Sequence, residues 1–238
     1  MPYGASLHYC EITPYRRNFI KFRLSSQVEY GEVINAFELM QKAVGAGIVI
    51  LIFGVLFGIA SIFSVYTFAV WLALMFIASA YPVYLMWRAF SLLHRNFDSV
   101  LYRYAAYVLL IVIVAMPVIG VVLAAYLISV AWGLQRPPVP GSDLGVRLVL
   151  WLVGVLFGAF WYRVWKQVEI DTNVDTFGIV ALLTILSAVL SPVSLISDLL
   201  DLAFLIVLYF AAGKAKGVFE DALLSQYRKE GNQHDLHK

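Results

Sequence analysis

Between Ala43 and Trp87 the sequence reads AVGAGIVILIFGVLFGIASIFSVYTFAVWLALMFIASAYPVYLMW, a run of 45 residues without a single Asp, Glu, Lys or Arg. One helical crossing of a bilayer core takes about 20 apolar residues, so this run is long enough for two crossings. The tetrapeptide Ser64-Val65-Tyr66-Thr67 near its middle favours a tight turn. We therefore predict membrane-spanning helices over 43–63 and 67–89.

The composition of the whole chain agrees with a lipid environment. Hydrophobic residues make up 62% of the chain and charged residues 13%, whereas soluble domains average about 25% charged residues. The net charge of +2 and the absence of a Lys- and Arg-rich stripe argue against nucleic acid as a partner. A single cysteine, Cys10, excludes an intrachain disulfide and a Cys-rich metal site. The lipid bilayer is the partner that this composition predicts.

Three further apolar stretches follow the first. A third span fits within Tyr104–Gly133, where Pro117 removes one backbone hydrogen bond. A fourth fits between Arg147 and Arg163, with both arginines reaching toward the headgroups. The last stretch, Phe177–Gly213, is interrupted at Pro192, which predicts two short helices.

The resulting prediction is an all-α, polytopic helical membrane bundle with six transmembrane helices. A five-span arrangement is the main alternative, with 177–196 crossing the bilayer and 199–213 lying in its interface. Residues 43–214 would form the transmembrane domain and 215–238 a cytoplasmic C-terminal tail.

Residues 1–42 form the only sizeable polar segment before the spans. Ser26 and Glu29 have the spacing of a helix capping box. Apolar side chains then recur at helical intervals, at Val33, Ile34, Phe37 and Met40. This pattern predicts an amphipathic helix that lies at the membrane surface as an interfacial anchor.

The distribution of Lys and Arg predicts the orientation. With six spans, fifteen of the 17 basic residues fall on one side of the membrane, and only Arg136 and Arg147 fall on the other. Positive residues are retained in the cytoplasm. We therefore expect a multi-pass protein of the cell membrane with both termini cytoplasmic.

Aromatic residues gather near the predicted span ends. Such positions are typical of the interfacial belt of a membrane protein. The residues assigned to this belt are Trp71, Trp87, Trp132, Trp151, Trp161, Trp165, Tyr81, Tyr84, Tyr102, Tyr104 and Tyr162.

Glycines at four-residue spacing provide candidate helix-packing faces. Gly47, Gly54 and Gly58 share one helix face, and the pentapeptide GVLFG that ends at Gly58 recurs from Gly154 to Gly158. Two glycines four residues apart allow another backbone to approach closely. Packing within the chain is the simpler interpretation, and a homo-oligomer formed through this face is the alternative. The repeated pentapeptide is also compatible with an internal duplication.

Few residues of the chain are candidates for catalysis or for binding a metal, an ion or a proton. All four histidines lie in predicted loops or tails, which argues against an intramembrane haem or zinc site. Asp198 and Asp201 lie three residues apart at membrane depth, where ionisable groups are costly and usually functional. They are a candidate ion or proton site. The simpler interpretation places both in the first turn of the last helix as N-terminal caps.

A second acidic cluster lies in a predicted cytoplasmic loop. It consists of Glu169, Asp171 and Asp175, with Asp98 as a counterpart in the first half. Paired aspartates bind Mg²⁺ in some membrane enzymes that act on lipids. Asp175 or Thr176 is more simply the N-cap of the next span, so we expect no metal or resident cofactor.

The second half also resembles known membrane proteins. The segment from Tyr162-Arg163 through Asn173 and Val174 to Phe177-Gly178, followed by a Leu-rich span, resembles prokaryotic multi-pass proteins of unknown function. The resemblance implies a small helical membrane protein and transfers no catalytic residue.

The function that these observations favour is that of a non-enzymatic membrane component acting by helix packing or partner binding. A small secondary transporter or channel is the alternative, with Asp198 and Asp201 on the substrate path. A lipid-modifying membrane enzyme built on the acidic cluster is the third hypothesis.

Overall fold

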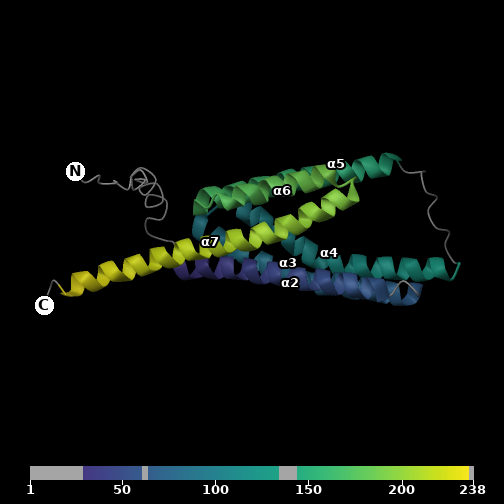
Figure 1. The fold of residues 1–238 in the computed structure, drawn as a ribbon, viewed down its shortest axis with the longest axis horizontal. Helices are drawn as coiled ribbons and strands as arrows, with labels where there is room; N and C mark the ends of the chain where they lie inside the picture. Colours follow the sequence, from purple (N-terminus) through teal and green to yellow (C-terminus); the bar gives the residue numbers. More distant parts are fainter. Residues whose placement is uncertain (1–28, 61–63, 134–143, 236–238) are drawn as a thin grey trace, which may run out of the picture.

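The computed structural model describes residues 29–60, 64–133 and 144–235. The Ser26 end of the capping box, most of the N-terminal segment and the connection around Arg136 lie outside these residues. Figure 1 shows the described residues as an elongated helical bundle. Its helices are α2 (Tyr30–Ala60), α3 (Val65–Phe97), α4 (Val100–Ala131), α5 (Leu144–Thr172), α6 (Thr176–Leu190) and α7 (Ser194–Asp235).

The predicted all-α membrane fold is confirmed for the described residues. Five of the six helices are long and apolar enough to cross a membrane. The exception is α6, whose 15 residues extend about 22 Å at 1.5 Å per residue, less than the core thickness of about 30 Å. The five-span alternative was wrong about which segment does not cross the membrane. It placed 199–213 in the interface, whereas that segment lies inside the long helix α7.

The breaks between helices lie close to where the sequence predicts them. Ser64 is the N-cap of α3, and its side chain accepts a hydrogen bond from the backbone N–H of Thr67. A turn at Ser191–Val193 separates α6 from α7 beside Pro192. The helical assignment of α4 continues through Pro117.

The six helices form two groups of three. The first helix group consists of α2, α3 and α4, and the second consists of α5, α6 and α7 (Figure 1). Within each group consecutive helices pack along one another, and α2 packs against α7 to join the groups. Contacts between α4 and α5 are sparse. The two groups are therefore held together mainly through α2 and α7.

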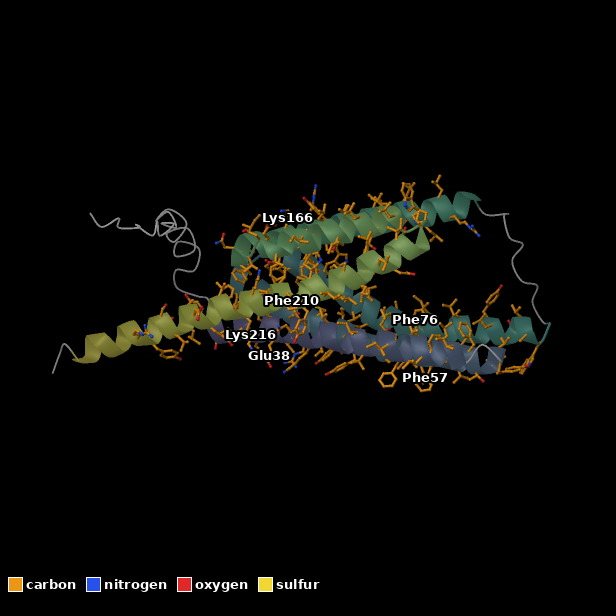
Figure 2. All side chains as sticks on the ribbon, viewed as in Figure 1. Glu38, Phe57, Phe76, Lys166, Phe210 and Lys216 are labelled. Atoms are coloured by element: carbon orange, nitrogen blue, oxygen red, sulfur yellow. The ribbon has the colours of Figure 1, made fainter. Side chains whose placement is uncertain are left out.

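One end of the bundle carries most of the described charges. Here α2 begins and the α3–α4 and α5–α6 turns lie together. In Figure 2, Lys166 lies on the upper side of this end, and Lys216 and Glu38 lie on the lower side. We call this the basic end and the opposite end the far end. Arg147 of α5 lies toward the far end.

The buried core lies at the basic end and draws on both groups. Trp165 of α5 is 2% exposed and stacks on Phe177 of α6 with ring centroids 6.1 Å apart. Phe37 of α2 stacks on Phe219 of α7 at 5.9 Å. Phe90 of α3 meets Trp165 at 5.6 Å. The last two of these ring contacts connect the first helix group to the second.

This core changes the interpretation of the N-terminal amphipathic helix. Val33, Phe37 and Met40 are fully buried in the shared core, so protein covers the apolar stripe that we expected on the membrane surface. The stripe belongs to the first turns of α2, which continues without a break to Ala60.

The last helix likewise continues beyond the predicted spans. Ala215 and Phe219, in the predicted C-terminal tail, are buried in the core. The helix α7 extends through both residues to Asp235. The predicted boundary after residue 214 therefore falls inside a helix.

Polar contacts reinforce the basic end. The side-chain oxygen of Asn96 accepts from the backbone N–H of Glu29 at 3.0 Å, so the end of α3 caps the start of α2. The Tyr102 hydroxyl of α4 donates to Asp171 of α5 at 2.7 Å. Glu38 of α2 and Lys216 of α7 lie 3.8 Å apart (Figure 2). All three contacts join residues that are far apart in the sequence.

Two glycines allow close helix approach nearer the far end. A Cβ atom built on Gly120 of α4 would lie 2.5 Å from the Cβ of Phe76 on α3. A Cβ atom on Gly158 of α5 would lie 2.5 Å from the Cβ of Ala188 on α6. Each helix pair therefore depends on the absence of a side chain at one position.

Candidate ligand-binding cleft

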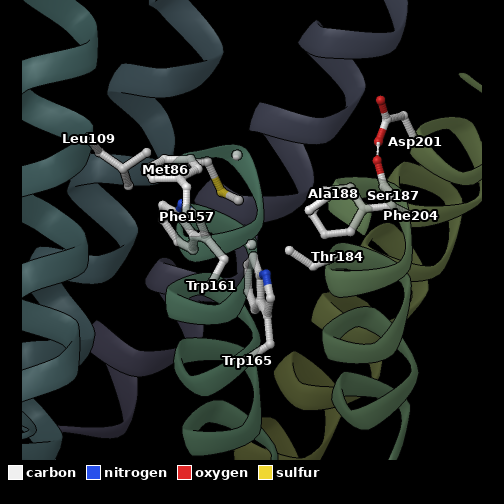
Figure 3. A pocket seen from close by; sticks show the side chains of 12 residues that line it. Met86, Leu109, Phe157, Trp161, Trp165, Thr184, Ser187, Ala188, Asp201 and Phe204 are labelled. Carbon is white, nitrogen blue, oxygen red and sulfur yellow. Dashed lines mark hydrogen bonds between the residues drawn. The ribbon is translucent and has the colours of Figure 1, made fainter. Parts of the chain in front are cut away.

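A cleft of about 290 Å³ lies where the two helix groups separate. Met86 of α3 and Leu109 of α4 form its wall on the first group, and all of its other lining residues come from the second group (Figure 3). We call this the inter-group cleft. It exists because the two groups share their core at the basic end and have few contacts beyond it.

The walls of the inter-group cleft are mainly apolar and aromatic. Phe157, Trp161 and Trp165 line it from α5, and Phe204 lines it from α7. Trp161 lies 6.0 Å from Trp165 between ring centroids, so the aromatic wall is continuous with the buried core. An apolar molecule bound in the cleft would contact these rings and displace lipid or water from them.

Three polar side chains line the same cleft. Thr184 donates its hydroxyl to the carbonyl of Val180 in its own helix, so it is already engaged. Ser187 of α6 donates to Oδ1 of Asp201 on α7 at 2.5 Å, and its Oγ lies 3.5 Å from the Oγ of Ser197. The polar character of the cleft is concentrated at the pair Ser187 and Asp201.

The structure separates the two aspartates that the sequence grouped together. Asp201 lines the inter-group cleft and Asp198 does not, although both residues are exposed. The interpretation of both as first-turn caps is wrong, because α7 begins at Ser194 and has no acidic residue in its first turn. Asp201 is far along α7 from the next basic residue of that helix, Lys214. The two lie thirteen residues apart, which is about 20 Å along the helix axis at 1.5 Å per residue.

The candidate packing glycines have different surroundings. Gly54 and Gly58 of α2 face Trp71 of α3, whereas a Cβ on Gly47 would meet nothing within 4 Å. Gly158 is pressed against α6, as described above. Gly154 lines the inter-group cleft, and a Cβ there would also meet nothing within 4 Å. The two copies of GVLFG therefore have different local packing.

Part of the expected aromatic belt lies inside the protein. Trp165 and Tyr102 are in the buried core, and Trp161 lines the cleft. Trp132, which is 64% exposed, retains a position compatible with a belt. Sequence reasoning missed the three inward aromatics because a ring near a span end has the same pattern whether it faces lipid or protein.

The three carboxylates of the predicted loop have separate surroundings, and Glu169 and Asp171 lie in the last turn of α5 rather than in a loop. Asp171 accepts hydrogen bonds from Tyr102 and Gln167, and Glu169 pairs with Lys166 at 2.7 Å. Asp175 occupies the N-cap of α6 without a side-chain capping bond. Within residues 29–60, 64–133 and 144–235, no three His, Cys, Asp or Glu side chains are grouped so that they could hold a metal ion.

The helices and the cleft together define a class of protein. Five helices long and apolar enough to cross a membrane are the architecture of a multi-pass integral membrane protein, and four of them line the cleft together with the short helix α6. Comparison of the chain with protein-family models, curated proteins and solved structures gives no match.

Proposed function

We propose that this integral membrane protein is a non-enzymatic component that binds a small apolar molecule in the inter-group cleft. The volume of the cleft carries the proposal. At about 290 Å³ it is close to the lower limit for small-molecule sites, about 300 Å³. A transmembrane helix with side chains is about 10–12 Å across and would need much more room. The partner is therefore a single chain or ring system.

The arrangement of the helix groups supports entry from the bilayer. The cleft takes its walls from both groups, and α4 and α5 contact each other only sparsely beside it. A molecule dissolved in the hydrocarbon core would reach the aromatic wall by passing between these two helices. Apolar walls with a few placed polar groups are typical of small-molecule sites.

Filling the cleft tests this proposal. The substitution Gly154→Leu adds a side chain at a cleft-lining position whose Cβ has open space around it. We expect it to abolish the quenching of Trp161 and Trp165 fluorescence by a brominated dodecyl chain in lipid nanodiscs. The measurement is a titration of tryptophan fluorescence with the probe.

The matched control is Gly47→Leu, because Gly47 also has open space around its Cβ but lies outside the cleft lining. This variant should be quenched like the unmodified protein. Equal, non-saturating quenching of all three proteins would show that the probe reaches the tryptophans only as bulk lipid, and the proposal would fail.

Transport of the bound molecule is the second candidate function. It is favoured by the position of Asp201 in the cleft, since carboxylates at membrane depth often lie on substrate paths. The mainly apolar lining supports binding more directly than passage of an ion.

We also propose that the basic end faces the cytoplasm, as the excess of Lys and Arg predicts. Cys10 is the only cysteine and belongs to the N-terminal segment. A membrane-impermeant maleimide should therefore label it in inside-out vesicles and leave it unlabelled in right-side-out vesicles. In a Cys10→Ser background, Ser142→Cys should show the opposite pattern. Labelling of Cys10 from outside would reverse the proposed orientation.

A further inference from the structure

We infer that the inter-group cleft selects single-chain amphiphiles whose head is a protonated amine, with Asp201 as the group that recognises the head. This inference rests on the proposed function and names the class of ligand. It makes Asp201 a specificity-determining residue, with the chain held by the aromatic wall.

The first step is the charge of the cleft. Asp201 is the only charged residue among its lining residues. Among the described ion pairs none includes Asp201. A carboxylate at membrane depth is costly unless an opposite charge or a proton neutralises it. A cationic head arriving with the ligand supplies that charge.

The second step is hydrogen-bonding direction. The Ser187 hydroxyl donates to Oδ1 of Asp201 and fixes the carboxylate (Figure 3). An ionised carboxylate only accepts hydrogen bonds, so its remaining capacity fits a ligand that donates. A primary ammonium group has three donors and a positive charge, whereas a fatty-acid head would repel the carboxylate.

The third step is the shape of the lining. Figure 3 shows Ser187 and Asp201 on one side of the lining and Phe157 and Trp161 on the other, with Trp165 below them in the view. A head at Asp201 therefore leaves the chain facing these rings across the cleft. A metal ion fits this site less well, because hard cations take about six or more oxygen ligands, and the part of the chain that the structure describes groups no three metal-binding side chains.

The experiment compares three competitors of equal chain length. Dodecylamine, dodecanol and dodecanoic acid are titrated against the brominated dodecyl chain in nanodiscs of zwitterionic lipid, and recovery of tryptophan fluorescence reports displacement. We expect dodecylamine to displace the probe at about tenfold to hundredfold lower concentration than dodecanol, the range for a charge-assisted hydrogen bond. Dodecanoic acid should be the weakest.

Two isosteric substitutions separate recognition from bulk partitioning. Asp201→Asn removes the charge in the cleft and should remove the preference for dodecylamine without changing dodecanol. Asp198→Asn removes the neighbouring exposed charge outside the cleft and should leave the preference intact.

The outcomes also distinguish this inference from the proposed function. If the brominated chain binds but dodecylamine and dodecanol compete equally in the unmodified protein, Asp201 does not recognise the head, and the inference is overturned while the cleft remains a binding site. If the preference for dodecylamine over dodecanol survives in Asp201→Asn, another group recognises the amine head and the inference is overturned. If the brominated chain does not bind at all, the proposed function fails first.

Discussion

Replacement of Trp165 by alanine is expected to lower the free energy of unfolding by about 3–5 kcal/mol, the range for truncating a large buried aromatic. Trp165 is 2% exposed and touches Phe177, Phe90 and Phe204. Its ring therefore joins α5 to three other helices, drawn from both groups, within the core that the described residues of the two groups share. Its loss leaves a cavity at the point where the groups are held together.

The measurement is thermal unfolding in detergent. The fraction of protein that remains monodisperse after heating to each temperature gives the melting temperature. Trp132→Ala provides the matched control, because the same truncation at a side chain that is 64% exposed removes little packing within the protein. We expect its melting temperature to stay close to that of the unmodified protein. Equal losses in the two variants would mean that the aromatic core at the basic end does not hold the groups together.

The second large effect is expected for Gly120→Ala, which should destabilise the protein by about 1–3 kcal/mol through overpacking. The new methyl group would lie 2.5 Å from the Cβ of Phe76 and 3.5 Å from the carbonyl oxygen of Ala73. Because the Phe76 Cβ is fixed to the backbone of α3, the helices themselves must move apart. Chemical unfolding of the purified protein measures the loss.

Gly154→Ala is the control for this substitution. A Cβ at Gly154 meets nothing within 4 Å, and alanine is the better helix former by up to about 1 kcal/mol. We therefore expect this variant to be unchanged or slightly more stable. A Gly120→Ala protein as stable as Gly154→Ala would contradict the close approach of α3 and α4.

The apolar parts of the fold were predictable because a long run without charged residues can adopt few structures other than membrane-spanning helices. The run from Ala43 to Trp87 predicted two helices with a turn near Ser64, and α2 and α3 meet there. Hydrophobicity marks where helices are apolar but not where they end. Both helices therefore extend well beyond the predicted spans into charged sequence at the basic end.

The shared core was not predictable for a related reason. The stripe of Val33, Phe37 and Met40 has the same helical period whether it packs on lipid or on another helix. Only the approach of α7, which buries Phe219 against Phe37, makes it a core. Similarly, Trp165 lies near a span end in the sequence and becomes buried only when α3 and α6 pack around it.

The candidate site could be found only in part. Asp201 stood out because an acidic residue at membrane depth is rare. Its separation from Asp198 depends on the rotation of α7, and its partner Ser187 comes from α6. Gly154 was identified as a packing residue from its spacing, yet it lines open space in the cleft. Helix rotation and the gap between groups are tertiary properties that a single sequence does not encode locally.

The most direct test of the inter-group cleft is a map of cross-links from a photoactivatable dodecyl chain to the protein in nanodiscs. Two neighbouring residues of α5 provide the comparison, because Phe157 lines the cleft and Leu156, 71% exposed, does not. A bound ligand predicts saturable labelling of Phe157 and Phe204 that excess unlabelled chain removes, with labelling of Leu156 unaffected by competition. Equal labelling of Leu156 and Phe157 without competition would contradict a binding site between the two helix groups.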